Sequence, residues 1–382
     1  MRILHTADLH LGIGKSGSSA RVERFLVFRR VLNLVEETDA DILLISGDFI
    51  EQDKIEASEL AEVIELLSKL ETRVFISPGN HDPASPVSIY RQNSFSNNVH
   101  VFLEPKTLIL PELKLSVSGA GFKTLYQREG LVPELSRTWA EADVPENYLN
   151  LALLHGEYTG QTNSIYNPIK QSHLLNSPFD YLALGHIHKP NLKLECAGET
   201  YYAQAGSPEP LDHSEVGVKG VHLLEFTNKR LVRHDYISTA RNIFLDVHVN
   251  LEDADNNELL IAEIQTNIET AKTNFIQELE NYSDYKAPDY TIAWNIYLVG
   301  STSLEFQINL ENLELFLEEL DIKTAAIYDK TSLSINADSL EKEDSLRGVF
   351  YRKLRAKIAE DPDNSAVYNR ALELGLRSFR EE

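Results

Sequence analysis

Short apolar runs alternate with amphipathic segments along the first 240 residues of the chain. The apolar runs have the length and composition of buried strands, and they cover residues 2–6, 41–46, 73–77, 149–154 and 180–184. Segments 21–37 and 56–70 place apolar residues three and four positions apart, which is typical of amphipathic helices. This alternation predicts a layered α/β domain.

The pattern changes after residue 240. Strands predicted at 200–204, 220–225 and 232–238 close the first domain. Beyond them the sequence predicts a strand (243–249), a long helix (256–280), a strand (291–299), a helix (310–320) and a short strand (325–327). We therefore expect a first domain over residues 1–240, a small α+β domain over 241–336 and a helical tail over 337–382.

The tail has the pattern of two helices, which break at Asp361-Pro362-Asp363 because proline cannot continue a helix. Each helix carries one apolar stripe, and the stripes contain Leu346, Phe350, Leu354 and Ile358, and Tyr368, Leu372, Leu376 and Phe379. These stripes either pack on the chain itself or dock a partner, and the sequence leaves both alternatives open.

Composition narrows the class of protein. The lone Cys196 excludes a disulfide framework and favours a reducing, cytoplasmic location. No segment approaches the roughly 20 apolar residues that span a bilayer, so we expect no membrane association. The net charge is −23, and residues 241–382 alone hold 28 acidic and 14 basic groups, which argues against broad attraction to nucleic acid.

Ligand-type side chains follow the predicted strands, each beside a glycine that lets the backbone turn closely. The stretches are HTADLHLG with Asp8 and His10, ISGDF with Asp48, SPGNHD with Asn80, His81 and Asp82, LLHGE with His155, and LGHIH with His186 and His188. Ligands of open α/β sheets bind outside the carboxyl ends of strands. Five such groups of Asp, Asn and His are therefore expected to form one metal site.

The donor types indicate which metal. The carboxylates are too few for a calcium cage and the imidazoles too many for magnesium, which favours Mn²⁺, Fe²⁺ or Zn²⁺. Seven ligands are too many for one ion, so two ions that share a carboxylate are predicted. Two ions about 3.5–4 Å apart support in-line hydrolysis of a phosphoester. His81 is then left to contact the phosphate and protonate the leaving oxygen, with Asp82 orienting its ring.

The ordered motifs D-x-H, G-D, G-N-H-D, H-G and G-H-x-H resemble those of the calcineurin-like metallophosphoesterases. The stretches RILHTADLHLG, ALGHIHKP and AGSPEPLDHSEVGVKGV are more closely similar to the SbcD-type DNA repair exonucleases, including the YhaO-like branch. The resemblance covers residues 1–240 strongly and the rest loosely. It implies two packed β-sheets flanked by helices, with a small α+β capping domain and a helical tail.

The resemblance also implies roles. One ion would bind Asp8, His10, Asp48 and His188, the other Asp48, Asn80, His155 and His186, and His81 would be the catalytic acid. The family further implies two Mn²⁺ per chain, 3′-5′ exonuclease activity on duplex DNA ends, endonuclease activity on single strands, and homodimers that act in DNA repair and recombination. Residues 241–336 would contact DNA, and the tail would dock on the coiled-coil base of an SbcC-type ATPase, which could supply DNA affinity that this acidic chain lacks.

Other candidate substrate contacts are Lys15, Arg21 and Arg24, in and beside a Gly/Ser-rich loop, and His213 near the expected rim of the site. A solvated connector that leads into a capped helix explains that loop equally well. Some relatives carry a histidine shortly after the G-D motif, whereas here Phe49-Ile50-Glu51-Gln52-Asp53 has none, which weighs against strand-directed exonuclease activity.

Three functions are therefore compatible with the sequence. The first is a two-metal DNA nuclease that acts with an ATPase subunit. The second is a phosphoesterase of the same superfamily that acts on a small substrate such as a nucleotide. The third is a metal-bound scaffold that holds DNA ends without hydrolysis, for which the loss of His81 or of a ligand would be the signature; none is lost.

Overall fold

The structure is a computed structural model of the 382-residue chain, and it describes residues 1–158, 164–251, 256–302, 306 and 308–379. The chain divides into two compact units. The first comprises Met1–Ile243 and Gln277–Thr291, and the second Phe244–Ile276 and Ile292–Glu382. Among the described residues, no helix is both long enough and apolar enough to cross a bilayer.

Two six-stranded sheets form the frame of the first unit. The first sheet contains β1 (Arg2–Thr6), β2 (Ile42–Ile45), β3 (Arg73–Ile76), β4 (Val99–Val101), β11 (Gly220–Thr227) and β12 (Arg230–Ser238). The second contains β5 (Lys106–Leu110), β6 (Leu115–Ala120), β7 (Leu149–His155), β8 (Tyr181–Gly185), β9 (Glu195–Ala197) and β10 (Thr200–Gln204). Their strand orders are β12-β11-β1-β2-β3-β4 and β5-β6-β7-β8-β10-β9.

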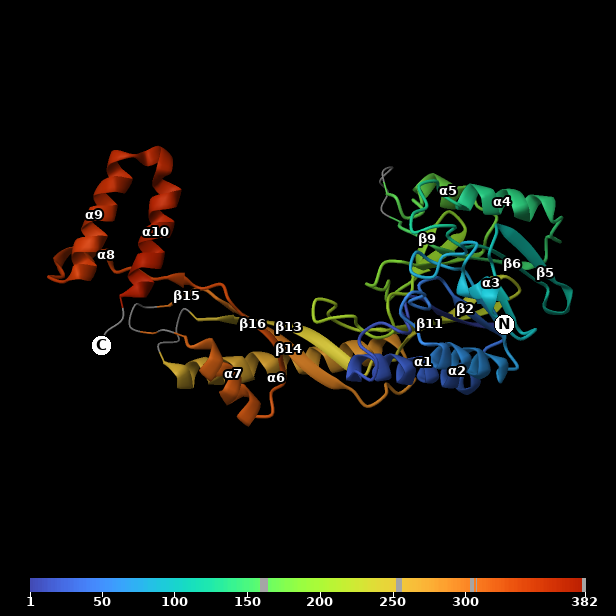
Figure 1. The fold of residues 1–382 in the computed structure, drawn as a ribbon, viewed down its shortest axis with the longest axis horizontal. Helices are drawn as coiled ribbons and strands as arrows, with labels where there is room; N and C mark the ends of the chain where they lie inside the picture. Colours follow the sequence, from blue (N-terminus) through green and yellow to red (C-terminus); the bar gives the residue numbers. More distant parts are fainter. Residues whose placement is uncertain (159–163, 252–255, 303–305, 307, 380–382) are drawn as a thin grey trace. The chain divides into compact units, whose positions relative to one another are not determined.

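Helices cover the outer face of each sheet. The amphipathic helices α1 (Ser19–Glu37) and α2 (Ala57–Ser68) pack on the first sheet, and α4 (Val132–Glu141) and α5 (Gln171–Leu175) pack on the second. Figure 1 shows the two helix pairs on opposite sides of the strands. A single-turn helix, α3 (Ile89–Gln92), and a short 3₁₀ helix (Pro111–Leu113) lie in connecting segments. The predicted class, two packed sheets flanked by helices, is confirmed.

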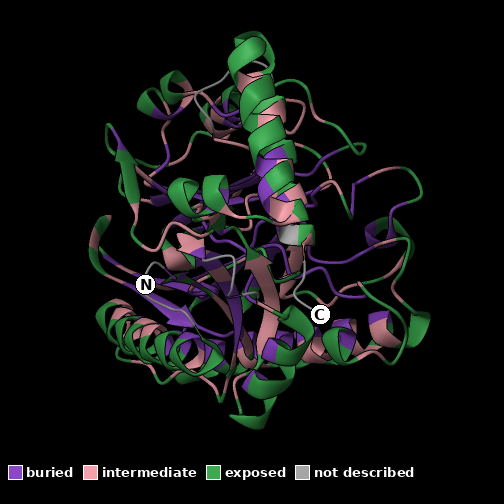
Figure 2. Ribbon diagram, turned by 90° about the vertical axis from the view of Figure 1, so that its left-hand side faces the viewer, coloured by how far each residue is buried: buried purple, intermediate pink, exposed green. Residues whose placement is uncertain are grey.

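Alternation along β1 explains how the layers hold together. Ile3 lies in the apolar cluster between the two sheets, whereas Leu4 lies in the cluster beneath α1 and α2. Both side chains are fully buried. The strands therefore supply core residues on both faces, and the outward faces of the helices remain exposed (Figure 2).

The direction of the strands positions the polar segments. Strands β1, β2 and β3 run parallel, and so do β6, β7 and β8. Parallel strands place their carboxyl ends at one edge of a sheet. Four of the five predicted ligand groups follow carboxyl ends of these strands, and the fifth, His155, is the last residue of β7.

The second unit contains a three-stranded sheet of β13 (Asn242–Asn250), β14 (Thr291–Val299) and β16 (Thr324–Asp329). Helices α6 (Asn257–Tyr282) and α7 (Leu310–Glu319) bury their apolar faces on it, and the last residues of α6 belong to the first unit. Two-residue strands β15 (Ser301–Thr302) and β17 (Ser332–Leu333) pair in parallel.

The tail contains three helices rather than the two predicted: α8 (Ala337–Lys342), α9 (Leu346–Glu360) and α10 (Ser365–Ser378), with a 3₁₀ turn (Pro362–Asn364) before α10. Leu372 and Leu376 of α10 are buried in a cluster with Tyr351 of α9. The apolar stripes therefore pack largely on each other. Leu346, predicted to share the stripe of α9, is instead 80% exposed because it lies at the first position of that helix.

Residues 99–141 contain β4, β5, β6 and α4, none of which is predicted from the pattern of apolar residues. Strand β6 reads LSVSGA, and small polar residues interrupt its apolar character. Its Ser116 and Ser118 are nevertheless fully buried, and their hydroxyls pair with Asn150 and Thr107. Hydrogen bonds formed only in the fold make this strand an interior one.

Candidate metal centre

Five loops at the carboxyl ends of parallel strands converge on one site of the first unit. Asp8 and His10 follow β1, Asp48 follows β2, and Asn80 and His81 follow β3. From the second sheet, β7 ends at His155, and His186 and His188 follow β8. The structure thus brings together the seven predicted ligands and His81. Their roles as metal ligands remain predictions.

The backbone is strained at these loops. Asp8, His10 and Asp48 have positive φ angles of 51°, 48° and 46°, and His186 has a φ of 97°. Residues other than glycine rarely adopt such angles, and they cluster where the surrounding structure fixes a functional geometry. Hydrogen bonds from Asp8 N to Gly47 O (3.0 Å) and from His10 N to Asp48 O (2.9 Å) hold two of these loops together.

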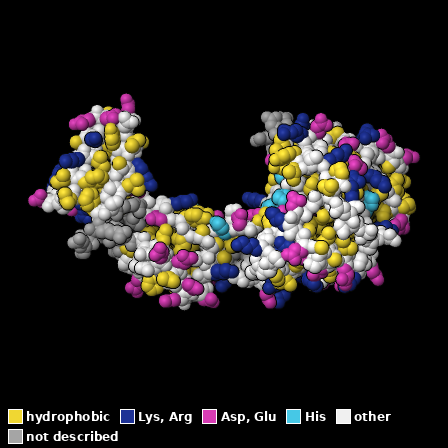
Figure 3. Space-filling model, in the orientation of Figure 1, with side chains coloured by type: hydrophobic (Ala, Val, Ile, Leu, Met, Phe, Trp, Pro, Cys, Tyr) yellow, Lys and Arg dark blue, Asp and Glu magenta, His cyan; other side chains and the backbone are white. Residues whose placement is uncertain are grey.

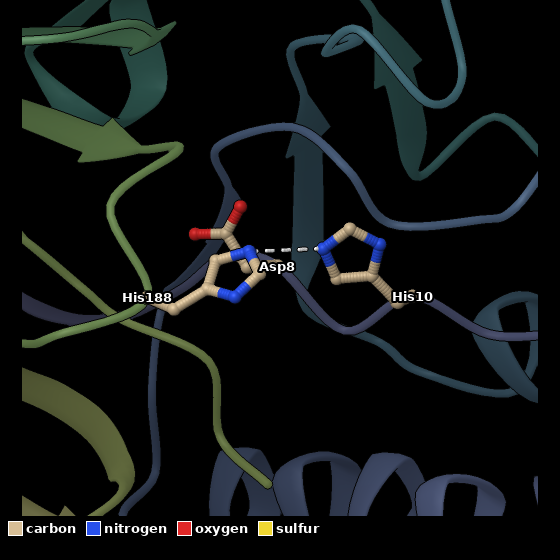
Figure 4. Close-up of side chains that lie close together, drawn as sticks. All are labelled: Asp8, His10 and His188. Atoms are coloured by element: carbon tan, nitrogen blue, oxygen red, sulfur yellow. Dashed lines mark hydrogen bonds between the residues drawn. The ribbon is translucent and has the colours of Figure 1, made fainter. Parts of the chain in front are cut away.

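Asp8, His10 and His188 form the first half of the site (Figure 4). The Nε2 atoms of His10 and His188 face each other at 3.2 Å. The carboxylate of Asp8 accepts hydrogen bonds from the backbone N–H of His186, at 3.0 and 3.1 Å, so its position is tied to the β8 loop.

A carboxylate holds each histidine of this first half. His10 Nδ1 lies 2.9 Å from Glu51 Oε1, and His188 Nδ1 lies 2.6 Å from Glu215 Oε1. Glu215 is itself fixed by Lys219, whose ammonium donates to its other oxygen at 3.0 Å. A carboxylate on Nδ1 fixes the ring and leaves Nε2 with its lone pair directed into the site.

Asp48, Asn80, His155 and His186 form the second half. His155 Nε2 lies 3.2 Å from Asp48 Oδ2 and 3.1 Å from Asn80 Oδ1, and Asp48, His155 and His186 meet as a metal-type cluster. His155 Nδ1 lies 3.0 Å from the backbone carbonyl of Ser46, so here a neutral oxygen replaces the carboxylates of the first half.

Asp48 lies between the two halves. Its Oδ1 accepts a hydrogen bond from His81 N at 2.8 Å, which leaves Oδ2 facing the histidines. Oδ2 is 3.2 Å from His155 Nε2 and 3.9 Å from His10 Nε2. This is the position that a carboxylate shared by two cations requires.

The spacing of the donor atoms fits metal binding. Two ligands on one ion, with bonds of about 2.1 Å, lie roughly 3.0–3.4 Å apart. The His10–His188, His155–Asp48 and His155–Asn80 pairs are 3.2, 3.2 and 3.1 Å apart. When each Nδ1 donates its proton outward, these pairs bring lone pairs together, which a cation stabilises. The residues present therefore fit a pair of divalent ions.

The charges of the second half agree with this picture. Burial opposes a proton on His155, but the facing Asp48 carboxylate outweighs burial and raises the pKa of His155 to about 9. The Asp48 carboxylate thus stabilises positive charge at Nε2 of His155, either a proton or a metal ion. Burial lowers the pKa of His186 to about 3, which keeps this imidazole neutral and able to bind a cation.

His81 is oriented by Glu51 and not by Asp82. Its Nδ1 lies 3.0 Å from the same Glu51 Oε1 that holds His10, and this hydrogen bond raises the pKa of His81. The half-exposed ring directs Nε2 toward the site, 4.0 Å from Asp48 Oδ2. His10, Asp48 and His81 also form a cluster of metal-type spacing.

The predicted contact of Asp82 with the His81 ring is wrong. Asp82 is buried, and its oxygens accept hydrogen bonds from the backbone N–H groups of Phe49 and Gly79 and from the Tyr90 hydroxyl, at 3.0, 2.7 and 2.6 Å. Burial raises its pKa to about 6. Asp82 therefore ties the β2 and β3 loops together beneath the site.

Two of the predicted substrate contacts are wrong as well. Arg21 is 4% exposed, and its guanidinium binds Glu59 and the carbonyls of Gly14 and Lys54. Arg24 is 3% exposed and binds the carbonyls of Leu9, Glu209 and Pro210. Both arginines point inward because their guanidinium groups donate charge-assisted hydrogen bonds to buried backbone carbonyls. Lys15 and His213 are exposed, and their substrate contacts remain predictions.

Sequence reasoning missed Glu51 and Glu215 as positioning residues. Glu51 lies three residues after Asp48, and Glu215 and Lys219 lie in the quoted stretch EPLDHSEVGVKGV. Nothing local indicates that Glu215 would meet a histidine 27 residues earlier in the chain.

Comparison with known proteins identifies a family for most of the first unit. Residues 1–190 match the family model described as calcineurin-like phosphoesterase. The "DNA double-strand break repair protein Mre11" of Methanopyrus kandleri is 26% identical, over 62% of this chain and 56% of that protein. One component of the nuclease SbcCD of Bacillus subtilis is 27% identical, over 57% of this chain and 64% of that protein. The chain thus spans between half and two thirds of these relatives.

A third relative is similar over nearly its whole length. The "Uncharacterized metallophosphoesterase YhaO" of Bacillus subtilis is 24% identical, over 96% of both chains. At this coverage its alignment includes most of the second unit.

Proposed function

We propose that this protein, whose residues 1–190 form a calcineurin-like phosphoesterase domain, is a metal-dependent nuclease that hydrolyses phosphodiester bonds of DNA. Metal-dependent hydrolysis of phosphoesters is the activity of that family. The observation that carries the proposal is the two-halved cluster centred on Asp48, with His81 held beside it by Glu51.

The residues have distinct roles in this mechanism. Asp8, His10, Asp48 and His188 would hold one divalent ion, and Asp48, Asn80, His155 and His186 the other. The mixed nitrogen and oxygen donors suit two Mn²⁺, with Fe²⁺ and Zn²⁺ as alternatives. Such a pair supplies hydroxide near neutral pH and stabilises charge on the phosphoryl oxygens. Glu51 holds His81 with Nε2 facing the site, where it donates a proton to the leaving oxygen.

DNA as the substrate is supported by the relatives named for double-strand break repair and nuclease activity. From the resemblance of the sequence motifs to SbcD-type exonucleases we further propose 3′-5′ exonuclease and single-strand endonuclease activity, a homodimer, and a coiled-coil ATPase as partner. Leu374 of α10 and Val367 are 50% and 65% exposed, so part of the tail's apolar surface is accessible for such docking.

A small-substrate phosphoesterase is the second candidate, and charge favours it. The chain carries a net charge of −23, and burial removes Arg21 and Arg24 from contact with a phosphate backbone. Over the described residues of the face in Figure 3, basic and acidic side chains are interspersed without a continuous basic band. A polyanion would then bind through the metal centre, local lysines and a partner.

One assay separates the candidates. The purified chain with Mn²⁺ is incubated with blunt duplex, hairpin and single-stranded DNA, and in parallel with mononucleotides and bis(p-nitrophenyl) phosphate. We expect the DNA to be degraded and chelation to stop the reaction. Hydrolysis of nucleotides with all DNA intact would favour the second candidate, and no hydrolysis of any ester would reject both.

A further inference from the structure

A pocket of about 570 Å³ opens beside His81, on the first unit. Three loops line it: residues 51–54 after β2, 80–86 after β3 and 123–125 after β6. Glu51, Asn80 and His81, which also belong to the candidate metal centre, are among the residues that line it. Its volume lies in the range of sites for small organic ligands, about 300–1,000 Å³.

The lining combines apolar walls with two ammonium groups and with the carboxylates of Glu51 and Asp53. Pro83, Pro86 and Leu125 provide flat or aliphatic surface, and Leu125 is 58% exposed. Lys54 and Lys123 lie along the same pocket, at ion-pair distances of 3.1 Å to Glu51 and 3.3 Å to Glu104. A phosphate alone would form no favourable contact with the apolar wall, and an alkyl group would form none with the lysines. A nucleoside with a neighbouring phosphate uses both.

The position of His81 indicates which part of a substrate enters. The proposed acid must lie within hydrogen-bond reach of the oxygen that leaves the phosphorus. The group attached to that oxygen therefore continues from His81, away from the metal ligands, and this is where the pocket begins.

We propose that this pocket holds the nucleoside whose oxygen leaves the scissile phosphate, with its base against Pro83, Pro86 and Leu125 and its next phosphate near Lys54 and Lys123. This assignment rests on the proposed phosphodiesterase function. A paired base would have to leave its partner to enter a pocket of this size. Unpaired ends and single strands are then better substrates than blunt duplex.

The first test measures binding, so that it does not depend on turnover. Thymidine monophosphates with the phosphate at the 3′ or 5′ position, and inorganic phosphate, are titrated calorimetrically into the Mn²⁺-loaded full chain. We expect at least one thymidine monophosphate to bind roughly ten-fold more tightly than phosphate, because its nucleoside buries apolar surface against Pro83, Pro86 and Leu125. Leu125→Asp should remove that difference. Leu175→Asp, a change at a similarly exposed leucine of α5 outside the pocket, should preserve it.

The second test measures turnover of two esters. Leu125→Asp and Lys123→Ala should raise KM for a single-stranded trinucleotide roughly ten-fold, whereas Leu175→Asp, outside the pocket, should leave hydrolysis of both the trinucleotide and bis(p-nitrophenyl) phosphate within about two-fold of wild type. Equal affinity of the wild type for phosphate and both nucleotides would overturn the pocket assignment. Tight nucleotide binding without hydrolysis of either ester would instead overturn the proposed function and leave the pocket assignment supported.

Discussion

The two halves of the candidate metal centre use the same side-chain types but are held in different ways. In the first half, Glu51 and Glu215 bind the Nδ1 atoms of His10 and His188. In the second half, His155 relies on a backbone carbonyl, that of Ser46, and burial keeps His186 neutral. A carboxylate makes an imidazole a stronger donor than a carbonyl does. We therefore expect the first half to bind a divalent ion more tightly than the second.

The two halves also differ in the residues that lie beneath them. The Ser46 hydroxyl lies 3.1 Å from His5 Nε2, and the Tyr181 hydroxyl lies 2.7 Å from His5 Nδ1. His5 is fully buried, and burial lowers its pKa to about 3. Neutral hydrogen bonds thus support the second half, whereas charged groups support the first.

The largest effect is expected from Asp48→Asn, because this residue serves both halves. Loss of the shared charge should reduce bound Mn²⁺ from about two ions per chain to less than one and lower hydrolysis by about 10³-fold or more. Metal analysis after gel filtration checks the first number and ester hydrolysis the second. Asp363→Asn in the exposed tail is the matched control. Retention of two ions in Asp48→Asn would contradict a shared carboxylate.

His81→Ala separates catalysis from metal binding. Loss of a general acid should lower the rate on DNA about 10²- to 10⁴-fold while the metal content stays unchanged. Asp82→Asn should instead lower the melting temperature, since its carboxylate satisfies buried donors from two loops. If His81→Ala lost an ion, His81 would be a metal ligand, as its proximity to His10 and Asp48 permits.

Glu51→Gln and Glu215→Gln test the first half directly. Each should weaken binding of one ion roughly 10- to 100-fold, measured by competition with a chelator, and leave the other ion in place. Only Glu51→Gln should also lower kcat at saturating Mn²⁺, because Glu51 alone also holds His81. Glu134→Gln on the surface of α4 is the control. Equal loss of both ions in either variant would remove the distinction between the halves.

The last prediction concerns the pH dependence of the free energy of unfolding, which reports on His5 beneath the second half. His5 stays neutral in the fold down to about pH 3, whereas in the unfolded chain it binds a proton near pH 6.5. Above pH 6.5 His5 is neutral in both states, so its protonation does not change the free energy of unfolding. As the pH falls below 6.5, only the unfolded state takes up the proton, so the free energy of unfolding decreases by about 1.4 kcal/mol per pH unit.

Urea unfolding of the wild type and of His5→Gln between pH 4.5 and 7.5 measures this term as the difference between the two pH slopes. Identical slopes in His5→Gln and wild type would show that a charged His5 is tolerated beneath the second half.

Much of the fold and the position of the site were predictable from the chain. Buried strands such as β2 (ILLI) and β3 (RVFI) carry their signal in their own residues, and their bounds agree with prediction within two residues. Strand β6 was missed because its serines are polar by composition and buried only through partners on β5 and β7. Arg21 and Arg24 were misassigned for the same reason, since their carbonyl partners become visible only in the fold.

The sequence by itself determined which atoms could serve as ligands and that they would meet. Each lies within a few residues of a strand end, and parallel strands bring such ends to one edge. Only the tertiary structure decided which carboxylate holds which histidine. Asp82, although adjacent to His81, points to backbone donors of two loops, while Glu51 reaches both His10 and His81. Local periodicity fixes the face on which a side chain lies, but its partner depends on the packing of loops distant in the chain.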